Sequence, residues 1–289
     1  MKMIENIYHT LLKEYSSQGW WPIISNKTLL CEYGLKAPRD EAERWEIIAD
    51  CILTQNTQWY PNVVRAIQQL KLGRPFTKKE LEVIKKAEIL KAKISGKPQK
   101  ITKPNILTQN TSWKNVEKAI GNLNKAKLLD IDKIMKTPVK KIAKLIRPAG
   151  YYNQKADRLK IVADYFSKHF KNKTIPSRDE LLNVKGIGPE TADSIFLYAF
   201  EQPYFVIDAY TKRIFSRLGF FKEDEKYEKV QKLFMGAFKD VKGKKKIEIF
   251  KEYHALIVEL AKRNCRKKAA CNNCIVTKIC KKNRMIGKD

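Results

Sequence analysis

Four cysteines near the end of the sequence have the spacing of a metal centre. The pattern C-x5-C-x2-C-x5-C is formed within sixteen residues by Cys265, Cys271, Cys274 and Cys280. Four thiolates this close together can surround either a zinc ion or an iron–sulfur cluster. Structural zinc sites usually pair two C-x2-C knuckles, whereas this segment has one knuckle and two single cysteines. The spacing therefore favours a [4Fe-4S] cluster, with zinc as the alternative.

A glycine turn lies between two short helical patterns in LLNVKGIGPETADSI, residues 181–195. Pro189 fits the first turn of the second helix, where the missing N–H is not needed. The glycines allow backbone conformations and close approaches that a side chain would block. The exposed N–H groups of such a turn suit a phosphate group. We therefore predict a phosphate-binding hairpin formed by Lys185, Gly186, Ile187 and Gly188.

A carboxylate follows the hairpin by twenty residues. In VIDAYTKRIF, Asp208 comes directly after an apolar stretch and begins a helical pattern. Aspartate is a favoured residue at the start of a helix, so a simple capping role is one interpretation. The other is a functional carboxylate held beside the hairpin.

The composition indicates a nucleic-acid partner. Lys and Arg number 59 against 31 Asp and Glu, which gives a net charge of +28. This excess predicts a polyanionic partner, with an anionic membrane surface as the alternative to nucleic acid. The sequence shows no membrane segment and no signal peptide, so we expect a cytoplasmic protein associated with the nucleoid and without membrane contact. In that compartment disulfides are rare, and Cys31 and Cys51 fit buried thiols.

Elements that position these residues are predicted to be helices. Apolar residues recur at intervals of three and four in stretches such as WEIIADCILTQ, ADRLKIVADYFSKHF and YHALIVELAK. No stretch alternates convincingly as a strand. The sequence predicts an all-α fold of about ten helices or more.

The combination of hairpin, aspartate and cysteines resembles a known family. LLNVKGIGPETADSI followed by VIDAYTKRI is similar to the helix-hairpin-helix and Gly/Pro…Asp signature of the HhH-GPD base-excision DNA glycosylases related to endonuclease III. The cysteines resemble that family's iron–sulfur loop, although the first spacing is one residue shorter than its usual C-x6-C. RPAGYYNQKADRLK is similar to the segment before the hairpin. The resemblance covers most of residues 1–57 and 106–289.

The resemblance implies a two-lobed architecture. One lobe is a helical barrel of residues 41–204 that contains the hairpin. The other joins both termini, residues 1–40 and 205–289, and holds the cluster. The implied partner is double-stranded DNA with a damaged base, bound by a monomer.

The resemblance also implies the chemistry. Asp208 becomes the catalytic carboxylate that stabilises the positively charged sugar while the base departs. Family members that also cut the DNA backbone carry a lysine at the position of Glu190, and its amine forms a Schiff base with the sugar. A glutamate cannot do this, so we expect a monofunctional enzyme that leaves an abasic site. As a first-turn residue, Glu190 also fits a favourable charge at a helix start.

Aromatic residues resemble the base pocket of the branch that removes 3-methyladenine. Trp20, Trp21 and Trp45, with Glu190, are the predicted pocket residues. Indole faces stack well on a cationic alkylated purine, but tryptophans also fill protein cores. A lysine that this branch has in a late helix is Leu256 here, which departs from the pattern.

The segment ILTQNT occurs twice, at residues 52–57 and 106–111. In the family its glutamine inserts into the gap left by the flipped base, so Gln55 and Gln109 are both candidates for DNA contact. We favour Gln55, because a long helix precedes it, whereas Pro104 interrupts the approach to Gln109. Residues 58–105 then form an insertion.

Two alternatives to a monofunctional alkylpurine glycosylase stay open. One is a bifunctional glycosylase and AP lyase for oxidised pyrimidines, which needs a lysine elsewhere, such as Lys185 or Lys212. The other is a DNA-binding iron–sulfur protein without catalysis, in which Asp208 only caps a helix.

Overall fold

A computed structural model of the 289-residue chain describes residues 2–25, 31–34, 38–55, 64–72, 77 and 130–281. Gln109, the second ILTQNT segment and most of the predicted insertion lie outside these residues. Contacts divide the chain into a first unit and a second unit. The first consists of Met1–Ile23, Glu32–Gln55 and Lys168–Asp289, and the second of Ile24–Cys31 and Asn56–Ser167. The lobes expected from the sequence have other boundaries and stay a prediction.

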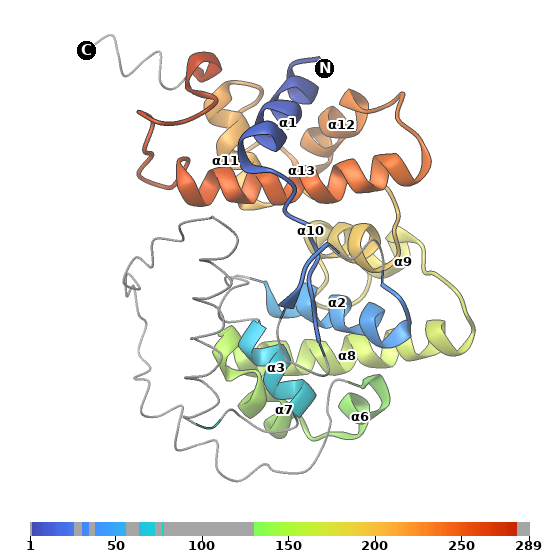
Figure 1. The fold of residues 1–289 in the computed structure, drawn as a ribbon. Coiled ribbons are helices and arrows are strands. Elements are labelled where there is room, and N and C mark those ends of the chain that lie inside the picture. Colours follow the sequence, from blue (N-terminus) through green and yellow to red (C-terminus); the bar gives the residue numbers. More distant parts are fainter. Residues whose placement is uncertain are drawn as a thin grey trace. The chain divides into compact units, whose positions relative to one another are not determined.

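The chain is mostly helical, as predicted (Figure 1). The first unit contains α1 (Lys2–Tyr15), α2 (Glu41–Leu53), α9 (Arg178–Leu182), α10 (Pro189–Ser194), the π-helical turn η3 (Ile195–Ala199), α11 (Ala209–Leu218), α12 (Tyr227–Ala237), α13 (Gly243–Arg263) and the 3-10 turn η4 (Thr277–Ile279). The second unit contains α3 (Val64–Leu72), α6 (Ile131–Lys136), α7 (Val139–Leu145), the 3-10 turn η2 (Arg147–Ala149) and most of α8 (Tyr152–Lys171). Two short strands, β1 (Ile23–Ile24) and β2 (Cys31–Glu32), pair with each other. Among the described helices, none has the length and apolar character needed to cross a bilayer.

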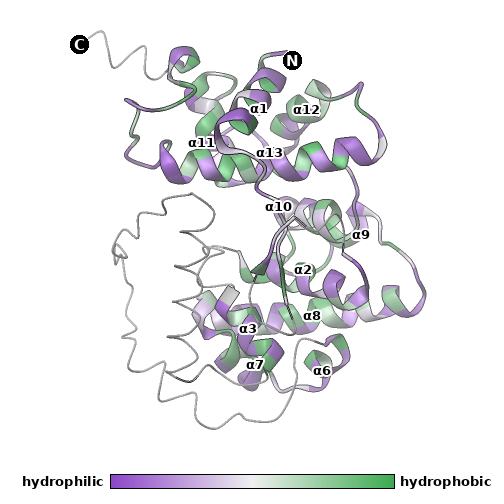
Figure 2. Ribbon diagram, viewed as in Figure 1, coloured by the Kyte–Doolittle hydropathy of each residue, from purple (hydrophilic) through white to green (hydrophobic). Residues whose placement is uncertain are grey.

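Helix α13 forms the centre of the first unit. It contacts α1, α11 and η3, and α1 also contacts α12 (Figure 1). Apolar and polar residues recur at helical spacing along α13 (Figure 2). The apolar residues therefore form a stripe that packs against the neighbouring helices. An aromatic cluster fills the space between these helices, with Phe205 stacked on Phe234 at a centroid distance of 4.4 Å and Tyr253 packed beside both. Phe215 of α11 packs against Phe234 and Tyr253, so this buried cluster fixes α11, α12 and α13 together.

In the second unit, α3 contacts α7 and η2. The start of α8 is tied to η2 by Lys155, whose Nζ donates a hydrogen bond to the carbonyl of Ala149 at 2.8 Å. Lys155 is almost completely buried, and this desolvation lowers its pKa to about 8. A segment resembling the family motif, RPAGYYNQKA, thus forms one packed corner of this unit.

Candidate active site

The predicted hairpin is present between α9 and α10. Ser177 caps α9 in a capping box with Glu180, and the chain then turns, with the N–H of Ile187 donating to the carbonyl of Val184 at 3.0 Å. Pro189 occupies the first turn of α10, as predicted. The second helix differs from expectation, because its α-helical part ends at Ser194 and continues as the π-helical turn η3.

The two hairpin glycines have different roles in the chain. Gly186 has φ +92°, in the left-handed region that favours glycine. Gly188 has φ −100°, and a Cβ atom built on it would meet nothing within 4 Å. Within the chain, therefore, only Gly186 requires glycine for its backbone conformation. Lys185 and Gly188 are exposed, whereas Ile187 is buried.

Gln55 contacts this hairpin directly. Its Nε2 donates to the carbonyl of Gly186 at 2.9 Å and to Oγ1 of Thr191 at 3.1 Å. Gln55 directly follows the C-cap of α2, Thr54. The structure thus brings one of the two predicted glutamines to the predicted hairpin.

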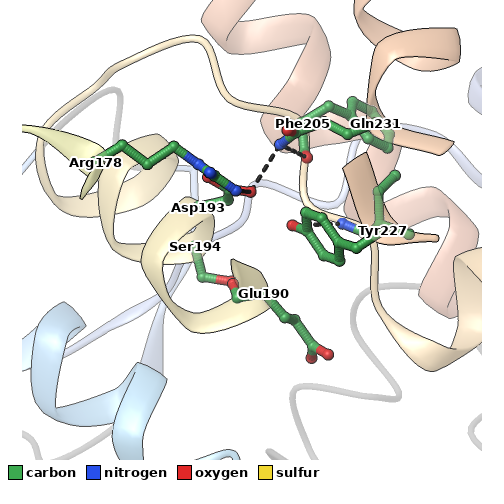
Figure 3. A network of polar contacts seen from close by, with 8 residues as sticks. Arg178, Glu190, Asp193, Ser194, Phe205, Tyr227 and Gln231 are labelled. Atoms are coloured by element: carbon green, nitrogen blue, oxygen red, sulfur yellow. Dashed lines mark hydrogen bonds and ion pairs between the residues drawn. The ribbon is translucent and has the colours of Figure 1, made fainter. Parts of the chain in front are cut away.

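A buried ion pair fixes α10, and sequence reasoning missed it. Arg178 of α9 donates to both carboxylate oxygens of Asp193, at 2.7 and 3.0 Å. Gln231 of α12 donates to the same carboxylate at 2.7 Å and to the carbonyl of Phe205 at 2.8 Å. Figure 3 shows that Glu190 lies on the same helix but points away from this network. The bidentate pair sets the orientation of α10 and therefore the direction of Glu190.

Asp208 is the N-cap of α11. Its Oδ1 accepts hydrogen bonds from the N–H of Thr211 at 2.7 Å and from the hydroxyl of Thr211 at 2.8 Å. The carboxylate is buried, with an exposed fraction of 9%. The capping interpretation is therefore correct, but it involves only one of the two carboxylate oxygens.

The second oxygen faces a histidine that the sequence did not single out. Nε2 of His254, in α13, lies 3.6 Å from Oδ2 of Asp208. The other ring nitrogen, Nδ1, is 2.7 Å from the hydroxyl of Tyr198 in η3. These contacts connect α13 to two earlier segments, η3 and the start of α11. A single histidine within the apolar stretch YHALIV of α13 was the only signal in the sequence that could have indicated this residue.

The two carboxyl groups near this site are shifted in opposite directions. Burial favours a higher pKa for Asp208, but the nearby His254 and the hydrogen bonds from Thr211 outweigh it and lower the pKa. The Glu190 side chain is exposed, yet the protein around it removes much of its hydration. This desolvation and the charge of Asp208, opposed by His254, raise the pKa of Glu190 to about 7. One carboxyl group is therefore held ionised while the other can hold a proton near neutral pH.

The three predicted tryptophans occupy different environments. Trp20 is half-buried, and its ring contacts the His254 ring edge-on at 6.1 Å. Trp21 is buried, with its Nε1 donating to Asp50 at 2.9 Å. Trp45 is 1% exposed inside α2, so a base could stack on it only after the core moved. Of the three, Trp20 has both exposure and proximity to His254.

The four late cysteines line one small pocket with Leu260 and Arg217. They lie around the C-terminal ends of α11 and α13, and Arg217 donates to Sγ of Cys265 at 3.3 Å. Burial raises the pKa of Cys274, and the other three thiols raise it further, so each of them lies close enough to affect Cys274. Within the described residues, however, no three Cys, His, Asp or Glu side chains are grouped as ligands of a single metal ion. All six cysteines of the chain are free thiols.

Comparison with known proteins gives consistent matches. The profile of the HhH-GPD superfamily base excision DNA repair proteins matches residues 105–240. A protein of Methanocaldococcus jannaschii, named as a putative DNA repair glycosylase, is 50% identical over 61% of this chain and 81% of its own length. Endonuclease III of Sulfolobus acidocaldarius is 30% identical over 68% of this chain and 89% of its own length.

Solved structures share the fold. The H. pylori 3-methyladenine DNA glycosylase MagIII, bound to 1,N6-ethenoadenine, has a TM-score of 0.54 and 24% identity, covering 91% of this chain and 95% of its own. An endonuclease III in a non-covalent DNA complex has a TM-score of 0.57 and 16% identity, covering 100% and 98%. The chain belongs to the HhH-GPD superfamily of base excision DNA repair proteins, as a DNA repair glycosylase related to endonuclease III.

Proposed function

We propose that this protein is a monofunctional DNA glycosylase that releases an alkylated purine, such as 3-methyladenine, by hydrolysis. The main support is the buried Asp208. Thr211 donates to its Oδ1 and His254 faces its Oδ2, and both residues lower its pKa and so favour the ionised form. Such a negative charge can stabilise the positive sugar that forms as the bond between sugar and base breaks. The role goes beyond helix capping, because a cap requires only the oxygen that Thr211 already binds.

Glu190 supports release without strand cleavage. Its carboxyl group has no amine with which to form a Schiff base. Lys185 and Lys212 are the nearby lysines that could supply this amine instead. Lys212 donates through Nζ to the carbonyl of Glu225 at 2.6 Å. Lys185 is exposed on the hairpin, where a phosphate contact accounts for its charge. With a pKa of about 7, Glu190 can donate a hydrogen bond to an acceptor on the base.

The surroundings of Trp20 support a cationic base. Nζ of Lys262 lies 5.6 Å from the centroid of the Trp20 ring, in a cation–π contact. A purine nucleotide alkylated at N3, as in 3-methyladenine, carries positive charge, so it can replace this ammonium over the indole. MagIII, which shares the fold, is a 3-methyladenine DNA glycosylase bound to 1,N6-ethenoadenine, and both of these bases are modified purines.

We further propose how the protein binds DNA. The hairpin of Lys185, Gly186, Ile187 and Gly188 contacts phosphates of the strand, and Gln55 fills the gap left by the flipped base. Flipping costs a few kcal/mol, which these contacts must offset. The net charge of +28 is consistent with a phosphate-dominated interface.

The cysteine loop is proposed to hold a [4Fe-4S] cluster. Its donor set fits, because cysteine thiolates are the usual ligands of such clusters and all four line one pocket. Arg217 fits as well, because a guanidinium that donates to Cys265 favours the thiolate form required for ligation. A bound cluster would be held by Cys265, just after α13, and by the three cysteines of the loop that follows, and it would join the two.

The test is a substrate panel. Duplexes carrying 3-methyladenine, thymine glycol or uracil are incubated with the purified protein and analysed with and without alkali, and borohydride is added to trap any covalent adduct. We expect release of 3-methyladenine, strand breaks only after alkali, and no trapped adduct. Breaks without alkali, with a trapped adduct, would show that another lysine acts and that the enzyme is bifunctional.

A further inference from the structure

The contact between His254 and Asp208 is incomplete. Nε2 of His254 is buried and has no hydrogen-bond partner among the described residues. It nevertheless faces Oδ2 of Asp208 at 3.6 Å, slightly beyond hydrogen-bond distance. A buried nitrogen without a partner carries a desolvation cost, and a shift of less than 1 Å would give it a charge-assisted partner.

Tyr198 and Asp208 together determine which ring nitrogen of His254 carries the proton. If the Tyr198 hydroxyl donates to Nδ1, the neutral ring must carry its proton on Nε2, which then points at Asp208. If the ring is charged, Nδ1 becomes a donor to the hydroxyl. The hydroxyl then has a second acceptor, the carbonyl of Lys251 at 3.5 Å. In both of these states Nε2 carries a hydrogen aimed at Asp208. The third arrangement, a neutral ring with its proton on Nδ1, would set the bare Nε2 against the ionised carboxylate, and two facing acceptors repel each other.

The other groups around the ring do not compete for Nε2. Trp20 contacts His254 edge-on from the N-terminal segment. Glu190 of α10 is the other nearby acid, and the charge of His254 lowers its pKa, against the larger effects of desolvation and Asp208. Lys262, on the same helix as His254, lies over Trp20. Asp208 is therefore the acceptor toward which the geometry directs the histidine.

We propose that His254 is a positioning residue that places an N–H donor against Oδ2 of Asp208 and so keeps this carboxylate ionised and fixed during base release. The inference rests on the proposed role of Asp208 in catalysis. Thr211 holds Oδ1 of the carboxylate, and a hydrogen bond from Nε2 of His254 to Oδ2 would restrict its rotation. Tyr198 acts indirectly, because its hydrogen bond to Nδ1 orients the His254 ring and helps to select the tautomer.

The test follows the carboxyl carbon of Asp208 by NMR with labelled aspartate, using Asp208→Asn to assign the signal. We expect Asp208 to titrate below an ordinary aspartate in the wild type. In His254→Ala it titrates at a clearly higher pH, because burial is no longer opposed. In His254→Gln, whose amide can still donate, and in Tyr198→Phe, Asp208 should titrate at a pH between those of the wild type and His254→Ala. His9→Ala, which changes an exposed histidine, leaves the titration unchanged.

Base release provides a second readout. His254→Ala should lower kcat about tenfold or more, as expected for one hydrogen bond to a charged group, with little change in KM, and its acidic limb should move to higher pH. If Asp208 titrates identically in the wild type, His254→Gln, His254→Ala and Tyr198→Phe, the inference is overturned. If no variant or wild-type protein releases a base, the proposed function fails, while the NMR titration still decides whether the two residues interact.

Discussion

The side chain of Gln55 donates a hydrogen bond to the carbonyl of Gly186, at 2.9 Å, and thereby joins the end of α2 to the turn between α9 and α10. These two residues were predicted separately, one from a repeated segment and one from a glycine turn. Their contact places two functional parts side by side. One is a polar side chain that can enter the gap left by a flipped base, and the other is a turn that can bind the DNA backbone.

Gln55→Ala should therefore lower the rate of base release from a fully paired duplex by roughly tenfold. The flipped state would lose about 1.4 kcal/mol of stabilisation, because no side chain fills the gap in the duplex. The deficit should shrink when the damaged base is mismatched, since such a base is easier to flip. Single-turnover kinetics on both duplexes measure this. Gln109→Ala is the matched variant from the second copy, which is the copy within the family match at residues 105–240. A larger loss in Gln109→Ala would assign the role to that residue.

The two hairpin glycines should respond oppositely to substitution. Gly186→Ala should destabilise the fold by about 1–2 kcal/mol, because its φ of +92° is unfavourable for a side chain. Gly188→Ser should leave stability unchanged or slightly raised, since the position is a helix N-cap with open space around it. If DNA phosphates approach the turn, the same Gly188→Ser variant should weaken DNA binding. Denaturant unfolding and a DNA titration at fixed salt separate the two effects, and unimpaired binding would contradict phosphate contact at Gly188.

Glu190 should make stability depend on pH. Its folded pKa of about 7 lies above its ordinary value of 4.5, so the folded chain disfavours the ionised form. Its stabilising contribution is therefore complete below about pH 4.5 and is lost as the pH rises to about 7. Glu190→Gln should match the wild type at low pH and melt at a higher temperature above pH 7. Melting curves from pH 4 to pH 8 test this, and a constant difference across the range would contradict the shift.

The cysteine loop should bind iron. Cys271→Ser should lose the bound iron and the visible absorption of a cluster, whereas Cys31→Ser, which removes a thiol outside the loop, should keep both. Metal analysis with absorption spectroscopy on protein purified without oxygen gives the result. One zinc ion per chain and no iron would favour the alternative site.

Much of the site follows from local sequence signals. Glycine, proline and a capping serine specify the hairpin because they act through the backbone of neighbouring residues. Asp208 was identifiable because an aspartate between an apolar stretch and an amphipathic helix starts that helix.

The remaining parts depend on tertiary packing. His254 and Asp208 are far apart in the sequence, and only the packing of α13 against α11 brings them together. The pair Arg178–Asp193 similarly needs the α9–α10 turn to close. Tryptophan composition could not separate the half-buried Trp20 from the fully buried Trp45, because both types of environment favour an indole ring.

The central claim is that Asp208 performs base release and does more than cap α11. It is tested by measuring 3-methyladenine release and DNA binding side by side for the wild type and Asp208→Asn, whose amide oxygen can still accept the hydrogen bonds from Thr211. We predict that the variant binds damaged duplex as tightly as the wild type and loses base release by a factor of at least about 100, since its charge is gone. Equal release by the two proteins would contradict the account and leave Asp208 as a helix cap.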